Sequence, residues 1–133
     1  MPQLAIDWAA VRGFGLAEFL CQCHLPVCDA VKAPSPRLVS ELVAVRADVG
    51  GPIIIASGIR CVKHNVAVGG EPDSAHLTGE AVDLRCSDAA TRARLLGRLC
   101  RSFQRVGIGR TFLHVDVADR PPAIWLYPST ITR

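Results

Sequence analysis

The stretch SAHLTGEAVD, residues 74–83, constrains the fold of this chain more than any other part of the sequence. Its histidine, His76, and its last carboxylate, Asp83, are seven residues apart. On a strand that interval puts the two side chains on opposite faces, and on a helix it separates them by two turns, about 10 Å. The two side chains converge only if the backbone turns between them, and Gly79 is the residue that permits such a turn. The stretch therefore predicts a turn that brings His76 toward Asp83.

The residues after this turn, 80–85, predict a short strand with two different faces. Val82 and Leu84 point into a core, whereas Ala81 and Asp83 point the other way. A buried carboxylate beside a small alanine is costly unless a positive group meets it. An arginine, a hydrogen-bond network or a metal ion would each meet that need.

A strand predicted over residues 111–117 has the same two-sided character. One face is apolar, and the other carries His114 and Asp116. Together with His76 and Asp83, His114 makes a set of three nitrogen and oxygen ligands. Zinc held by three protein ligands keeps a fourth position for water, which is the catalytic arrangement. The alternative for each histidine is a hydrogen-bonded residue of the core.

Two amphipathic helices and two further strands complete the predicted fold. Ser35-Pro36 and Ser87-Asp88 are typical helix starts, and Gly50-Gly51 ends the first helix. The further strands are expected at residues 52–56 and 123–127. Four strands separated unevenly by helices indicate an α+β fold, with a small, mostly antiparallel sheet and flanking helices. The sequence shows no repeat and no linker, so we expect one domain over residues 1–133.

Composition narrows the class of protein and of partner. Half of the 133 residues are hydrophobic and a fifth are charged, which is typical of a compact globular chain. The formal net charge of +3 favours an acidic polymer such as a cell-wall glycan, while no basic run or RNA-binding motif supports nucleic acid. We find no apolar stretch of membrane-spanning length and no signal peptide, so we expect synthesis in the cytoplasm, no membrane insertion and a monomer.

Cysteine is the unusual residue of this composition, with six in the chain. Cys21, Cys23 and Cys28 form a C-x-C-x4-C pattern that encloses His24. Three interpretations stay open for this pattern. It is half of a structural zinc site completed by Cys61 or His24, a disulfide cluster, or a set of small buried hydrophobes.

Four short stretches, which follow one another in the family's order, resemble one family. Residues 74–83 have the pattern S-x-H-x-x-G-x-A-x-D, residues 57–60 read S-G-I-R, and residues 65–70 read N-V-A-V-G-G. Downstream, residues 106–117 read V-G-I-G-R-T-F-L-H-V-D-V. The pattern resembles the M15 family of zinc peptidases, which includes D-Ala-D-Ala carboxypeptidases and peptidoglycan endopeptidases, and in particular its H-V-D branch. The resemblance covers residues 14–127 and implies a hedgehog/DD-peptidase-like fold.

The resemblance implies a catalytic zinc ion held by His76, Asp83 and His114. Arg60 matches the family arginine that contacts the substrate or the developing oxyanion, where a cation stabilises the transition state. Ser74 is the serine of the signature and a candidate for substrate binding. The implied activity is hydrolysis of amide bonds in the peptide stems or cross-links of bacterial peptidoglycan.

The chain departs from the family pattern at Thr111. Many members carry an acidic general base there, three residues before the last zinc histidine, and threonine does not replace it. Asp116 is the nearest alternative, either as the catalytic base or as a group that orients a zinc ligand. Because that acid is missing, a non-catalytic, metal-containing module that binds the cell wall is the alternative function. Without a signal peptide, a phage or prophage lysis enzyme that acts at the wall is a further hypothesis.

Overall fold

The computed structural model describes residues 5–133 and has a five-stranded sheet with the order β1-β2-β4-β3-β5. The first four residues of the expected domain, Leu4 among them, lie outside the described residues. The strands are β1 (Ile55–Ser57), β2 (Ala81–Arg85), β3 (Arg105–Ile108), β4 (Phe112–Asp116) and β5 (Ala123–Leu126). The helices are α1 (Pro36–Val49), α2 (Val62–Ala67) and α3 (Ala89–Ser102), and the 3-10 turns are η1 (Leu16–Phe19) and η2 (Ala75–Thr78). The α+β fold with a mostly antiparallel sheet is confirmed.

The sheet has one strand more than the sequence indicates. The pairs β1–β2, β2–β4 and β3–β4 are antiparallel, while β3 and β5 are parallel. The additional strand is β3, whose Gly107-Ile108-Gly109 end is typical of a turn. Glycine weakens a strand that stands alone, but here β3 is paired on both sides, so the tertiary ladder overrides the local preference.

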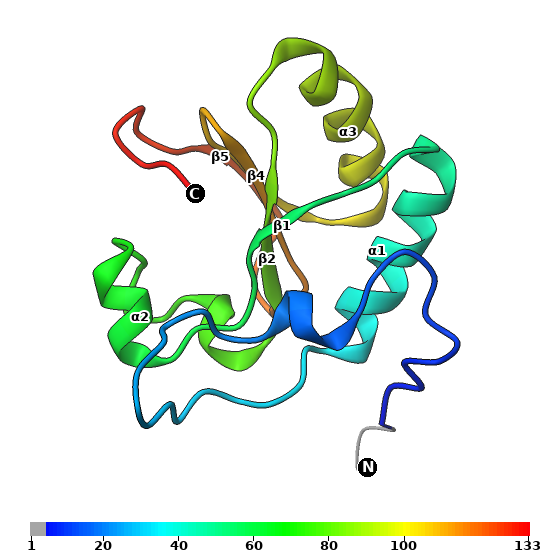
Figure 1. Cartoon of the computed structure of the whole chain (residues 1–133). Coiled ribbons are helices and arrows are strands. Elements are labelled where there is room, and N and C mark those ends of the chain that lie inside the picture. The colour runs from blue at the N-terminus through cyan, green and yellow to red at the C-terminus, as the bar shows by residue number, and fades with distance from the viewer. Residues whose placement is uncertain (1–4) are drawn as a thin grey trace.

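The helices α1 and α3 cover one face of the sheet (Figure 1). Helix α1 begins as expected, with Ser35 Oγ accepting a hydrogen bond from the backbone N–H of Leu38, and it ends at Gly50 in the left-handed conformation. The main core lies between these helices and the apolar side chains of β2 and β4. One face of the sheet is thus fully used for packing.

The opposite face of the sheet carries the polar residues of β2 and β4. Asp83 lies directly across from His114, and Ala81 lies across from Asp116. Helix α2 lies on this side of the sheet (Figure 1). The predicted division of both strands into an apolar and a polar face is confirmed, because Val82 packs in the main core while Asp83 faces away from it. Among the helices within residues 5–133, none has the length and apolar character needed to cross a bilayer.

Candidate metal centre

The turn η2 presents His76 to the sheet. Ser74 caps this turn, since its Oγ accepts a hydrogen bond from the backbone N–H of His76 at 3.2 Å. Gly79 ends the turn with a φ of 76°, a left-handed conformation that glycine adopts without strain. A side chain there would also press on the carbonyl oxygen of Ala33, 2.9 Å from the Cβ position. The predicted turn at Gly79 is confirmed, and it brings His76 to Asp83.

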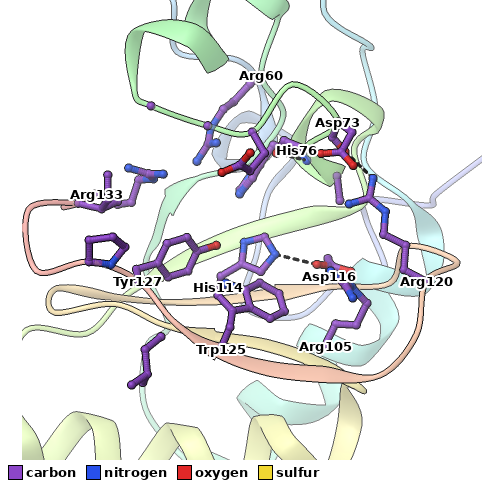
Figure 2. Close-up of a pocket in the computed structure, with 18 residues that line it drawn as sticks. Arg60, Asp73, His76, Arg105, His114, Asp116, Arg120, Trp125, Tyr127 and Arg133 are labelled. Atoms are coloured by element: carbon purple, nitrogen blue, oxygen red, sulfur yellow. Dashed lines mark hydrogen bonds and ion pairs between the residues drawn. The ribbon is translucent and has the colours of Figure 1, made fainter.

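Three buried donor atoms converge above the sheet, from His76, Asp83 and His114. Figure 2 shows the two histidines of this set at the floor of the cleft. His76 Nε2 lies 3.2 Å from Asp83 Oδ1, and His114 Nδ1 lies 2.9 Å from the same oxygen. The exposed fractions of His76, Asp83 and His114 are 2%, 1% and 5%. One atom from each residue lies within 4.8 Å of the other two, so the three side chains can share one metal ion.

The outer nitrogens of the two histidines fix the tautomer of each ring. His76 Nδ1 donates to the carbonyl oxygen of Gly58 at 2.6 Å, and His114 Nε2 donates to Asp116 Oδ2 at 2.8 Å. In the neutral rings the inner nitrogens therefore carry lone pairs, and both point at Asp83 Oδ1. Three electron-rich atoms that face one another suit a cation between them. The donor set thus fits a metal ion on the evidence of its hydrogen bonds.

The second oxygen of Asp83 is held by two arginines. Arg60 donates to Oδ2 at 2.7 Å and Arg133 at 3.1 Å, which leaves Oδ1 for a metal. Burial alone would raise the pKa of Asp83, but the two neighbouring histidines lower it well below its ordinary range. Arg60 is 2% exposed and also donates to Ser57 Oγ at 2.9 Å. The structure therefore places Arg60 against a candidate ligand of the metal centre, with its edge at the cleft.

Asp116 uses both of its carboxylate oxygens on neighbouring side chains. One accepts from His114, and the other accepts from Arg105 Nε at 2.8 Å. Burial raises the pKa of Asp116, but His114 and Arg105 lower it further than burial raises it, so the group is ionised at neutral pH. Conversely, burial lowers the pKa of His114, but Asp116 and Asp83 raise it above its ordinary value. A carboxylate in this position orients a histidine ligand and makes it more basic.

The two roles open to Asp116 predict different results for an Asp116→Ala variant. If the carboxylate orients His114, metal affinity falls about 10- to 100-fold while turnover at saturating metal changes little. A general base would instead cost about 100- to 10,000-fold in turnover with metal affinity unchanged. We expect the first result, because both carboxylate oxygens are already bonded. Metal competition with a chelator and turnover at saturating metal separate the outcomes, with the exposed Asp119→Ala as control.

An open cleft of about 400 Å³ lies over the centre. His76, His114 and Asp116 line it together with residues that the sequence did not single out as site residues: Arg105, Arg120, Tyr127 and Arg133. Trp125 also lines the cleft, and its ring centroid lies 5.3 Å from that of His114. Burial raises the pKa of Tyr127 to about 12, so its hydroxyl stays protonated at neutral pH.

The place of Trp125 in the cleft depends on Gly107. In the register of β3 with β5, Gly107 lies beside Trp125, and in the register of β3 with β4 it lies beside His114. A Cβ on Gly107 would fall 2.5 Å from the Tyr127 ring and 2.7 Å from Trp125 Nε1. This small residue therefore admits both aromatic rings beside His114. The sequence feature that could have placed Arg105 and Gly107 beside the centre is their spacing of two residues, which puts them on one face of a strand. This feature can be used only when residues 105–108 are recognised as a strand.

Thr111 and Ser74 have structural contacts of their own. Thr111 Oγ1 accepts a hydrogen bond from the backbone N–H of Arg133 at 3.3 Å, and its backbone carbonyl accepts from Cys86. Ser74 lines the cleft as well as capping η2. The acids that line the cleft besides Asp116 are Glu71 and Asp73, both on the exposed loop before the turn.

The comparisons with known proteins agree with this geometry. Residues 12–117 match the family described as Peptidase M15, and this span includes the three convergent side chains. No curated protein matches the chain. Because the match covers most of the sequence and the His-Asp-His set is placed to bind a metal, this chain belongs to the peptidase M15 family.

Proposed function

We propose that this protein is a zinc-dependent peptidase that hydrolyses amide bonds in the peptide stems or cross-links of bacterial peptidoglycan. The observation that carries the proposal is the convergence of His76 Nε2, Asp83 Oδ1 and His114 Nδ1 beneath an open cleft. Two imidazoles and one carboxylate are a common protein ligand set for catalytic zinc. Bound there, zinc supplies a Lewis acid that activates water and polarises the amide carbonyl.

The residues around the centre support its ligands. Gly58 and Asp116 hold the outer nitrogens of the two histidines, so that each ring keeps a lone pair for the metal. Arg60 and Arg133 occupy one oxygen of Asp83 and keep the other turned toward the histidines. These contacts preorganise the ligands, which is what a metal site needs in order to keep its geometry during turnover.

The composition of the cleft suits a stem peptide. Arg105, Arg120 and Arg133 line it, and guanidinium groups bind carboxylates, which stem peptides carry along their length. Trp125 and Tyr127 add an apolar wall with a hydroxyl that stays protonated. Both oxygens of Asp116 are already bonded, so Glu71 and Asp73 are the lining carboxylates that remain available to accept a proton.

Digestion of purified sacculi tests this function. Zinc-loaded wild-type protein is expected to release muropeptides with new amino termini, whereas a His76→Ala variant releases none above the level without enzyme. Mass spectrometry of the products distinguishes the candidate bonds, which are D-Ala-D-Ala, L-Ala-D-Glu and a cross-link to meso-diaminopimelate. Binding to sacculi without any release would contradict the proposal and favour the non-catalytic wall-binding module.

A further inference from the structure

Four cysteines form a second cluster of potential metal ligands, apart from the His-Asp-His centre. The Sγ atoms of Cys21, Cys23, Cys28 and Cys61 all lie within 4.8 Å of one another. Cys61 is buried and the other three are half-buried. The sequence left open whether His24 or Cys61 completes the first three, and the structure brings Cys61 to them from a position far along the chain.

We propose that these four cysteines bind a second zinc ion, which is structural and fixes the loop at residues 21–28 to the start of α2. A zinc ion with four thiolates about 2.3 Å away places the sulfurs about 3.8 Å apart. All of the Sγ–Sγ distances lie within 4.8 Å, which is compatible with that geometry. Four thiolates leave no open position for water or substrate, which is characteristic of a structural site.

The backbone around the cluster supplies hydrogen bonds to its sulfurs. Cys21 Sγ accepts from the backbone N–H of Cys61 at 3.3 Å, and Cys61 Sγ accepts from that of His64 at 3.4 Å. Cys23 Sγ accepts from the backbone N–H of Leu25 at 3.5 Å. This last bond requires the chain to fold back directly after Cys23, and His24 adopts a φ of 56° to do so. Such donors stabilise the negative charge of thiolates that bind a metal.

The other two interpretations of the cysteines explain less of this arrangement. All six cysteines fall within residues 5–133 and carry free thiols there, and a disulfide would bring one pair to about 2.05 Å while leaving the other sulfurs outside the bond. As a purely hydrophobic cluster, the group is small, with Ala30, Ile59 and Leu20 as its apolar members besides the cysteines. A metal ion replaces the stabilisation that so small a core does not supply.

The position of Cys61 links this cluster to the catalytic centre. Cys61 directly follows Arg60, which holds Asp83, and the backbone N–H of Arg60 donates to the carbonyl of His76 at 3.0 Å. On the other side, the N–H of Ile59 donates to the carbonyl of Phe19 at 2.8 Å, just before the cysteine loop. The loop lies beneath α2 and η2 (Figure 1). The second zinc thus braces the segment that supports Asp83 and His76.

Metal analysis of a variant that lacks the catalytic ligands tests this proposal independently of the peptidase activity. We expect His76→Ala/His114→Ala, purified with reductant and zinc, to retain one zinc ion per chain. Its cobalt form should show the intense near-ultraviolet charge-transfer bands of cobalt thiolates. Adding Cys28→Ser should remove both the zinc and the bands, whereas adding Cys100→Ser, an exposed cysteine outside the cluster, should change neither.

A thiol titration of the wild-type chain decides the question even if the serine variant does not fold. A mercurial reagent should release the cysteine-bound zinc in step with the reaction of four thiols. The proposal is overturned if the double histidine variant retains no zinc under reducing conditions. It is equally overturned if the reagent modifies all four thiols of the wild-type chain without releasing a zinc ion, or if mass analysis shows the four cysteines joined in disulfides.

Discussion

A His114→Ala variant is expected to lose peptidase activity by about 1000-fold or more, because its three-ligand metal site becomes a two-ligand site. Metal-assisted polarisation is worth several kcal/mol of transition-state stabilisation, and each 1.36 kcal/mol is a factor of ten in rate. His114 contributes to the centre in two ways, since its inner nitrogen faces Asp83 and its outer nitrogen donates to Asp116. Removing the imidazole ring therefore removes one metal ligand, and it leaves the buried carboxylates of Asp83 and Asp116 without their contact to His114.

The measurement for this variant pairs turnover on sacculi with zinc content. The expected zinc content is one ion per chain below that of the wild type. A His64→Ala variant is the matched control, because His64 is half-buried and belongs neither to the convergent set nor to the lining of the cleft. Unchanged turnover and unchanged zinc content in His114→Ala would contradict the assignment of the ligand set.

An Arg60→Met variant is expected to lower the free energy of unfolding by about 3–5 kcal/mol, which is the usual cost of removing one partner from a buried ion pair. Arg60 is almost fully buried and holds Asp83 Oδ2 at 2.7 Å, with further bonds to Ser57 and Asn65. Methionine fills much of the same volume but leaves the carboxylate of Asp83 without its shortest contact. Arg133 remains at 3.1 Å from the same oxygen and sets a limit on the loss.

Urea unfolding of the zinc-free proteins measures this effect, with the exposed Arg101→Met as control. The pH dependence adds a second readout. The folded-state pKa of Asp83 lies below its unfolded value, so the stability from its ionised form is present above the ordinary carboxyl range and is lost as the pH falls below it. The difference between Arg60→Met and wild type should therefore shrink in acid. A loss below about 1 kcal/mol at neutral pH would indicate that Arg60 serves mainly the substrate.

Local patterns predicted that the three side chains could meet, and the resemblance to the M15 family made them a set of metal ligands. The spacing of His76 and Asp83 around Gly79 required a turn, and the alternation in the strand that carries His114 required a polar face. Both features depend on short-range geometry, which a sequence expresses directly. The structure then pairs Asp83 with His114 across two neighbouring strands, which brings the predicted faces together.

The surroundings of the centre depend on contacts that are distant in the sequence. Arg133, fifty residues further along the chain, donates to Asp83. Arg105 donates to Asp116 on the neighbouring strand, and the glycines at the end of β3 make that strand hard to predict from the sequence. Which nitrogen of His114 faces the centre follows only from the position of Asp116 beside the other one. Likewise, Cys61 meets the C-x-C-x4-C loop through the tertiary fold, so the spacing of the cysteines alone left several interpretations open.

X-ray diffraction of zinc-loaded crystals on both sides of the zinc absorption edge tests the central claim most directly. The account predicts an anomalous peak bounded by His76 Nε2, Asp83 Oδ1 and His114 Nδ1, at about 2.0–2.2 Å from each atom. It also predicts that this peak disappears in His114→Ala while the peak among the four cysteines stays. A zinc-loaded crystal with no peak between the two histidines and Asp83 would contradict the assignment of this protein as a zinc peptidase.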